Sequence, residues 1–121
     1  MTEIQKSKLY DLEERTLAFS KRVRAFIKKL PKMTSNFEDG KQVIRSSGSV
    51  GANYIEANES LSKKDFIMRI KICRKEAKET RYWLFLIDTA NSSELEQERK
   101  QLIQEIAELM KIFGAILEKS K

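Results

Sequence analysis

Residues 45–56 read RSSGSVGANYIE, a stretch with no charge between its two end residues in a chain in which 35% of the residues are charged. Four interpretations suit this composition: a flexible loop, a phosphate-binding loop, the site of a serine nucleophile, or a helix that another helix approaches closely. The stretch lies near the middle of the chain, so the choice among these four decides how the fold is organised.

The apolar and small residues around this stretch keep a helical period. They fall on two neighbouring lines of a helix: Val43, Ser47, Val50, Tyr54 and Ala57 on one, and Ile44, Gly48, Gly51 or Ala52, and Ile55 on the next. A loop has no reason to keep such a period. We therefore predict a helix, with a break at Gly48 as the alternative.

Two glycines inside this predicted helix need an explanation, because together Gly48 and Gly51 cost about 2 kcal/mol of helix propensity relative to alanine. Close approach of a neighbouring helix over the small side chains would offset that cost. The pattern predicts a helix-packing surface or a subunit interface that consists of Ser47, Gly48, Gly51, Ala52, Asn53 and Ile55. Asn53 is expected to hydrogen-bond across the bundle or to another subunit. The approaching helix can come from the same chain or from the next subunit.

Three more amphipathic stripes predict three further helices. The first stripe consists of Leu9, Leu12, Thr16, Phe19, Val23, Phe26 and Leu30. The next, on heptad spacing, consists of Phe66, Ile70, Cys73, Ala77, Thr80, Leu84 and Ile87. The last consists of Leu95, Leu102, Ile106, Leu109, Phe113 and Ile116. Pro31 is expected to end the first of these helices.

Capping boxes predict where the later helices begin, because a serine and an acidic residue three positions on can satisfy free backbone N–H groups. Ser35–Glu38 predicts a start near residue 36, and Ser93–Glu96 predicts the start of the last helix. Ser62–Asp65 forms a third box, in which Leu61 and Phe66 are placed to form a hydrophobic staple.

The overall composition agrees with an all-α protein. The chain has 121 residues, 40% of them hydrophobic, with one Pro and four Gly, which is too apolar for disorder and too poor in turn formers for a many-stranded β fold. Four helices with short connections predict an antiparallel up-down-up-down four-helix bundle, as a single domain over residues 1–121. Residues 1–6 lack a signal-peptide pattern, Cys73 has no second cysteine to pair with, and no apolar run could span a bilayer, so we expect a cytoplasmic protein without membrane association.

Enzymatic chemistry finds little support in the sequence. The chain contains no histidine to serve as a base for Ser46, Ser47 or Ser49, and the G-x-S-x-G and P-loop patterns are absent. Glu56, Glu59, Glu76 and Glu79 resemble the paired carboxylates of a bundle metal site, but di-iron bundles also use Glu-x-x-His. An all-carboxylate Mg²⁺ or Mn²⁺ site stays as an alternative. Ion pairs of these carboxylates with Arg45, Lys71 or Lys75 are preferred, so we assign no catalytic, metal or cofactor-binding residue.

The net charge of +6 is concentrated in two parts of the chain. Residues 1–33 hold nine Lys/Arg against four Asp/Glu, and residues 63–90 hold eight against four. Helical spacing gathers the cations into two ridges, which consist of Lys21, Arg24 and Lys28 on the first helix and Lys71, Arg74, Lys78 and Arg81 on the third. Such ridges could follow the phosphates of RNA or DNA with little dependence on base sequence.

The alternative for both ridges is a solvated helix face whose charges pair locally, for example Lys75 with Glu79. No aromatic residues interleave with the ridges, as they do in surfaces on which bases stack.

A family resemblance rests on three stretches: RSSGSVGANYIEA at 45–57, SKKDF at 62–66 and KEAKETRYWL at 75–84. Together they resemble the four-helix-bundle proteins encoded by intervening sequences of bacterial 23S ribosomal RNA genes. The resemblance covers most of residues 36–90. It implies a four-helix protomer in a homopentameric ring. It also implies similarity to the accessory protein of diversity-generating retroelements, a basic pentamer that binds a reverse transcriptase and nucleic acid. It supplies no catalytic residues.

Our leading expectation is therefore a non-enzymatic, oligomeric helical module that binds RNA, DNA or a nucleoprotein partner through the two basic ridges, without a cofactor. The rival hypothesis is a protein–protein assembly scaffold whose charge only keeps it in solution. An enzyme with an all-carboxylate metal site is the third.

Overall fold

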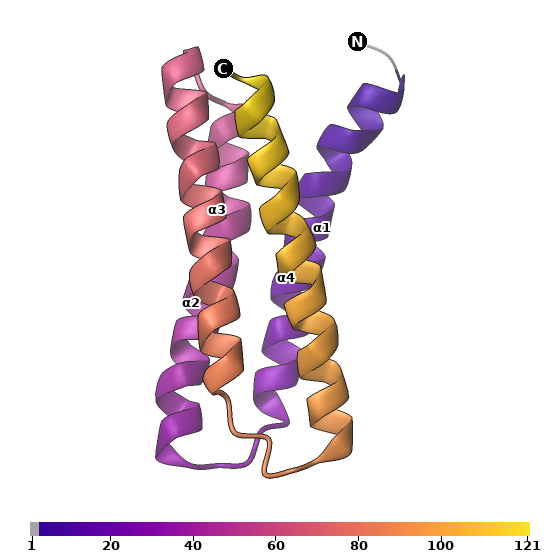
Figure 1. The fold of residues 1–121 in the computed structure, drawn as a ribbon, viewed down its shortest axis with the longest axis vertical. Helices are drawn as coiled ribbons and strands as arrows, with labels where there is room; N and C mark the ends of the chain where they lie inside the picture. The colour runs from indigo at the N-terminus through magenta and orange to yellow at the C-terminus, as the bar shows by residue number, and fades with distance from the viewer. Residues whose placement is uncertain (1–2) are drawn as a thin grey trace.

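The computed structural model describes the backbone of residues 3–121 and the side chains of residues 12–121. Within this range the chain forms four helices and no strand: α1 (Glu3–Lys28), α2 (Thr34–Asn58), α3 (Lys63–Leu86) and α4 (Ser93–Lys119). The helices run alternately up and down, joined by connections of four to six residues (Figure 1). The predicted all-α, antiparallel four-helix bundle is confirmed.

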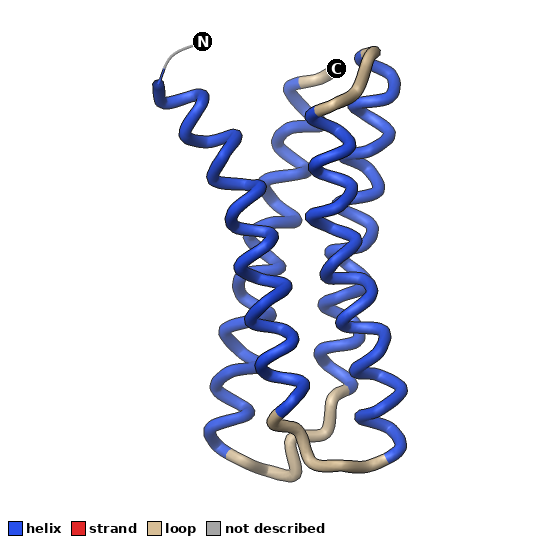
Figure 2. Tube along the Cα trace, turned by 180° about the vertical axis from the view of Figure 1, so that it is seen from behind, coloured by secondary structure: helices blue, strands red, loops and turns tan. Residues whose placement is uncertain are grey.

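Each helix packs against its neighbours in sequence, and α1 also packs against α4. Among the described residues the backbones of the diagonal pairs, α1 with α3 and α2 with α4, are not neighbours. In the core, the rings of Tyr54 on α2 and Phe113 on α4 still meet, with centroids 6.1 Å apart. The bundle therefore has four outer faces, which we name after the two helices that border each one: α1/α2, α2/α3, α3/α4 and α1/α4. The α1–α2 and α3–α4 connections lie at one end of the bundle, and the α2–α3 connection lies at the other (Figure 2).

The predicted stripes form the core. Residues 45–56 are helical throughout, with no break at Gly48. Their inward line is buried and consists of Val43, Ser47, Val50, Tyr54 and Ala57. The α3 stripe is buried from Ile70 to Ile87, with Phe66 half-buried at its start. Leu9 of the first stripe lies outside the residues whose side chains are described.

The start of α3 is confirmed in one part and wrong in another. Ser62 is the N-cap, and its hydroxyl accepts a hydrogen bond of 3.1 Å from the amide of Asp65. The predicted hydrophobic staple is wrong, because Leu61 is 99% exposed and so cannot pack on Phe66. The four-residue connection turns the Leu61 side chain away from the bundle.

The predicted start of α2 near residue 36 is two residues too late, and the predicted cap at Ser35 is wrong. The helix begins at Thr34, and its N-cap, Met33, provides no side-chain cap. Asn36 lies inside the first turn and is buried. Its side chain donates to the carbonyls of Pro31 (3.1 Å) and Asp88 (2.8 Å) and accepts from the Asp88 amide (2.9 Å). Asn36 thus joins the α1–α2 and α3–α4 connections, and these contacts fix the helix start earlier than the local capping pattern does.

The predicted cap of α4 is wrong by one residue. The N-cap is Ser92, whose hydroxyl accepts from the Leu95 amide, and not Ser93. The Glu96 carboxylate does not reach back to the helix start. It accepts hydrogen bonds from Arg99 and Thr89. Both bonds lower the pKa of the Glu96 carboxyl, and the bond from Arg99 has the larger effect. Ala90 and Asn91, both at positive φ, turn the chain into this cap.

Within the described residues, no helix combines the length and the apolar character needed to cross a membrane.

Candidate nucleic-acid interface

The basic ridge of α3 lies on its exposed side, next to α4. Lys71, Arg74 and Lys78 are exposed and Arg81 is half-buried. The four cations span about 15 Å along the helix axis, because an α-helix rises 1.5 Å per residue. No acidic residue falls on this line, which runs from Ile67 through the four cations to Phe85 at spacings of three and four. The ridge is therefore a strip of one sign of charge.

None of the four cations of this ridge forms an ion pair with a residue whose side chain is described. Glu79, which was the expected local partner of Lys75, pairs with Arg45 at 3.6 Å. Glu105 and Glu108 pair with Arg15 on the α1/α4 face at 2.8 Å and 2.9 Å. The hydrogen bond from Arg15 lowers the pKa of Glu105. The ridge is thus left with its full positive charge.

Helix α4 adds further cations to the same face. A Cβ atom on Gly114 would lie 4.0 Å from a guanidinium nitrogen of Arg74, so Arg74 reaches over α4 where that helix has no side chain. Lys111, one turn before Gly114 on the same side of α4, is exposed. Lys100 lines a shallow groove together with Phe85. The sequence gives no signal for these two lysines, because the register of α4 against α3 is set by tertiary packing.

The α3/α4 face also carries an aromatic ring, contrary to the expectation of none. Phe85 continues the ridge one turn beyond Arg81, and 62% of its surface is exposed. Its groove partners on α4 include Gln97, Lys100 and Ile103. Phe85 follows the same spacing of three and four that defines the ridge, so its place at the end of the ridge could have been predicted from the sequence. We name the combination of Lys71, Arg74, Lys78, Arg81, Phe85, Lys100 and Lys111 the α3/α4 basic face.

The second predicted ridge lies elsewhere. Lys21, Arg24 and Lys28 are exposed on α1, which lies diagonally opposite α3 in the bundle. Arg24 donates to the Ser20 carbonyl at 3.2 Å, and its other guanidinium nitrogen would lie 3.8 Å from a Cβ on Gly48 of α2. This places Arg24 on the α1/α2 face, opposite the α3/α4 face. The structure therefore does not bring the two ridges together within one protomer.

The predicted small-residue surface of α2 divides into two parts. The first part packs inside the chain. A Cβ on Gly51 would lie 3.0 Å from Oγ1 of Thr16, so α1 of the same chain makes the close approach. Ser47 is buried, and its backbone carbonyl accepts a hydrogen bond from Ser20 of α1. Asn53 accepts a hydrogen bond of 3.0 Å from Arg69 of α3, which is a contact across the bundle.

The second part stays open. Gly48, Ala52 and Ile55 line a groove of about 370 Å³ between α1 and α2, together with Leu17 of α1. Leu17 is 56% exposed and Ile55 is 50% exposed, so the rim of this groove is apolar and faces solvent. The cations Lys21 and Arg24 lie along it. We name it the α1/α2 groove.

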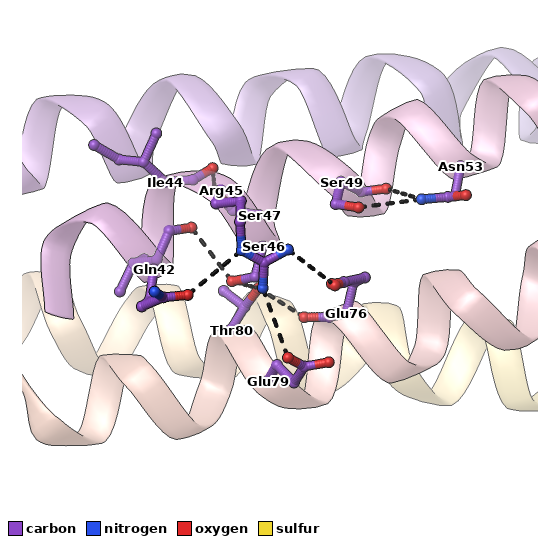
Figure 3. A network of polar contacts seen from close by, with 11 residues as sticks. Gln42, Ile44, Arg45, Ser46, Ser47, Ser49, Asn53, Glu76, Glu79 and Thr80 are labelled. Carbon is purple, nitrogen blue, oxygen red and sulfur yellow. Dashed lines mark hydrogen bonds and ion pairs between the residues drawn. The ribbon is translucent and has the colours of Figure 1, made fainter. Parts of the chain in front are cut away.

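A polar network holds α2 to α3 (Figure 3). Arg45 of α2 reaches the carboxylates of Glu76 (3.3 Å) and Glu79 (3.6 Å) on α3. The side chain of Glu76 is only 7% exposed, and its second oxygen has no hydrogen-bond partner among the described residues. In the core beside this network, the hydroxyl of Thr80 donates a hydrogen bond of 2.7 Å to the hydroxyl of Ser46. The expected pairing of these carboxylates is confirmed for Arg45 and not for Lys71 or Lys75.

The four carboxylates of the alternative metal site, Glu56, Glu59, Glu76 and Glu79, do not converge. Glu76 and Glu79 are held by Arg45, while Glu56 and Glu59 are exposed on α2 and in the connection that follows it. Among the residues that were described, no group of three or more acidic or cysteine side chains is placed to hold a metal ion. Cys73 is buried and donates to the Val50 carbonyl, and burial raises the pKa of its thiol to about 12.

The chain is similar to known proteins both in sequence and in fold. The family model described as 23S rRNA-intervening sequence protein matches residues 9–115. A solved structure of a protein of unknown function from the S23 ribosomal protein family, from Bacteroides thetaiotaomicron VPI-5482, has a TM-score of 0.78 and 31% sequence identity. The match covers 92% of this chain and 98% of that one. No curated protein sequence matches the chain at a significant level.

Proposed function

This chain belongs to the 23S rRNA-intervening sequence protein family, and on that premise we propose that it is a non-enzymatic helical module that binds RNA or DNA, free or within a nucleoprotein, through the α3/α4 basic face. Membership by itself names no activity. The proposal depends on the charge and the geometry of this one face.

The observation that carries the proposal is a strip of cations that form no ion pair with any described side chain. Four of these cations lie along α3, and Lys100 and Lys111 lie beside them on α4. Cations that are not already neutralised by carboxylates can release the counterions condensed on a nucleic acid, which is the main source of affinity for a phosphate backbone. The guanidinium groups of Arg74 and Arg81 can each hold a phosphate through two hydrogen bonds, whereas the lysines act as point charges.

The same geometry predicts that binding depends little on base sequence. Phosphate contacts position a protein on a nucleic acid but carry no base information. A helix side that presents only Lys and Arg to the ligand therefore favours affinity over specificity. Assembly of several copies, such as the homopentamer that the family resemblance implies, would repeat the face and raise the avidity for a long strand.

The α1/α2 groove favours a second candidate, a protein–protein assembly scaffold. Its rim exposes Leu17 and Ile55, which a monomer would leave in water, and Gly48 and Ala52 let another helix come close. In this alternative the groove builds a homo-oligomer, and the charge on the α3/α4 face only solvates it. Lys21, Arg24 and Lys28 would then border a subunit contact instead of touching nucleic acid.

Binding to a mixed-sequence RNA at about 50 mM salt separates the two candidates. The proposed function predicts retardation of the RNA by the native protein and a large loss when Arg74→Glu and Arg81→Glu are combined. The matched control combines Lys21→Glu and Arg24→Glu on the opposite face, and it should keep most of the binding. No retardation by the native protein, or equal losses in both double variants, would contradict the assignment to the α3/α4 face.

Light scattering of the same samples tests the scaffold. A native mass of several protomers that persists without RNA binding, and that falls when Ile55→Lys is introduced, would favour the second candidate. A stable monomer would remove both the scaffold and the ring.

A further inference from the structure

We infer that the α3/α4 basic face selects single-stranded over duplex nucleic acid, with the ring of Phe85 as the platform on which an unpaired base stacks. This inference rests on the proposed function and specifies the class of ligand.

The position of Phe85 is the first observation. It follows Arg81 by four residues on the same side of α3, about 6 Å farther along the helix axis. A strand whose phosphates follow Lys71, Arg74, Lys78 and Arg81 would therefore reach the Phe85 ring directly after the last cation. The ring is 62% exposed, so a flat ligand can cover it.

The surroundings of the ring supply partners for a nucleotide. The groove beside Phe85 is lined by Ile103, which adds an apolar floor, and by Gln97 and Lys100 of α4. The amide of Gln97 can donate to and accept from the edge of a base, and Lys100 can meet the next phosphate. Glu96 also lines the groove, but Arg99 and Thr89 hold its carboxylate, which reduces its repulsion of a phosphate.

The other exposed aromatic residues are different. Tyr82 packs edge-on against Trp83, with ring centroids 5.2 Å apart, so it already has a partner within the protein. Phe37 is 60% exposed, but it lies on the α1/α2 side, away from the α3/α4 basic face. Its pocket is lined by Ile27 and Gly40 and by the cations Lys28, Lys32 and Lys41. Among the described aromatic residues, Phe85 alone continues a basic ridge and lacks a ring partner.

Single strands fit this arrangement better than duplexes. The bases of a duplex are stacked on one another and paired, so an aromatic ring on a helix surface cannot reach their faces. An unpaired base can leave its neighbours and stack on a phenyl ring, whatever its identity, because every base has a π-face. The α3/α4 basic face thus combines a track for the backbone with one stacking site at its end.

The test compares a single-stranded RNA of about 12 nucleotides, within the usual size of such sites, with the duplex of the same sequence. Fluorescence anisotropy would give the two dissociation constants for the native protein and for Phe85→Ala, Phe85→Trp and Phe37→Ala. Phe85→Ala should weaken the single strand roughly 5- to 100-fold and leave the duplex within about twofold. Phe85→Trp should keep the affinity for the single strand. Phe37→Ala, an equally exposed aromatic residue off the face, should change neither.

Failure of the stacking inference can be distinguished from failure of the proposed function. If Arg74→Glu with Arg81→Glu weakens both ligands but Phe85→Ala behaves like Phe37→Ala, then the stacking inference is overturned and the basic face stands. The inference is also overturned if Phe85→Ala weakens the duplex as much as the single strand. If the charge reversals weaken neither ligand, the proposed function itself fails. Far-ultraviolet circular dichroism of each variant checks that the exposed substitutions leave the bundle folded.

Discussion

Gly51 of α2 and Thr16 of α1 make the closest helix–helix approach that any glycine of the described chain permits. A Cβ on Gly51 would lie 3.0 Å from Thr16 Oγ1 and 3.2 Å from Thr16 Cβ. The Thr16 hydroxyl is held by the carbonyls of Leu12 and Glu13, at 2.8 Å and 3.1 Å. Thr16 is therefore unable to turn away, and the contact fixes α1 against α2 within one chain.

Gly51→Ala should lower the free energy of unfolding by about 1 kcal/mol, because overpacking against Thr16 costs more than the helix propensity gained from alanine. Gly51→Leu should lower it much further. Gly48→Ala is the matched control: the nearest atom to its new Cβ would be an Arg24 nitrogen at 3.8 Å, so it should gain up to about 1 kcal/mol. Urea denaturation measures all three. Equal stabilities of Gly48→Ala and Gly51→Ala would contradict the close packing.

Arg45→Met should lower the free energy of unfolding by about 1–3 kcal/mol, because it leaves the buried Glu76 carboxylate without a partner. Adding Glu76→Gln to this variant should recover part of the loss, since a neutral amide is less costly to bury than a carboxylate. Thermal and urea unfolding of the two single variants and the double variant form a complete cycle. A simple sum of the two single effects would show that Arg45 and Glu76 do not interact.

The buried thiol of Cys73 should make stability fall as the pH rises above about 9. Burial raises the pKa of this thiol to about 12 in the folded protein, from 9.0 for a free thiol. The unfolded chain therefore ionises first, and between these two values each pH unit favours unfolding by about 1.4 kcal/mol. Cys73→Ala should lose less stability between pH 9 and pH 11 than the native protein.

Burial also raises the pKa of Tyr54, which is present in both proteins. The charge of the Cys73 thiolate contributes to that rise, so the substitution removes this coupling together with the thiol. The prediction fails if the two stability curves run parallel over this range. Labelling with iodoacetamide gives an independent check, because only the thiolate reacts. The folded protein should be inert at pH 8 and become reactive on unfolding.

Asn36→Ala should lower the free energy of unfolding by about 2 kcal/mol, since it leaves the Asp88 amide without its hydrogen bond and removes the donor to two carbonyls. Asn36→Asp keeps the acceptor for the Asp88 amide but faces the carbonyls of Pro31 and Asp88 with a carboxylate. It should therefore be no more stable than Asn36→Ala. Hydrogen exchange at the Asp88 amide should speed up in Asn36→Ala, which removes its acceptor, and unchanged exchange in that variant would show that Asn36 does not clamp the connections.

The helices and the core were predictable because both depend on the period of apolar residues. This period correctly predicts the buried line from Val43 to Ala57 and the α3 stripe from Ile70 to Ile87. It also places the small residues Gly48, Gly51 and Ala52 inside a helix, as the structure does. The helix ends were less predictable. Ser62 follows the local capping rule, but Asn36 and Ser92 are placed by contacts with residues far away in sequence or by a turn at Ala90.

Only part of the α3/α4 basic face could be predicted from the sequence. The cations of α3 share one helix side, and that follows from spacing alone. Their isolation from carboxylates depends on which helices are neighbours, because Arg45 and Arg15 take up the nearby acids. Lys100 and Lys111 join the face only through the packing of α4 on α3, and the ridge of α1 separates from it because α1 lies diagonally across the bundle.

The salt dependence of binding to single-stranded RNA tests the α3/α4 basic face most directly. If its cations neutralise up to six phosphates, the logarithm of the association constant should fall against the logarithm of salt concentration with a slope of about −4, because each phosphate of a single strand contributes about 0.7. Combining Arg74→Gln with Arg81→Gln should make the slope shallower by about 1.4, whereas combining Lys21→Gln with Arg24→Gln should leave it unchanged. No measurable binding at about 50 mM salt, or a slope that both pairs of substitutions alter equally, would contradict the account.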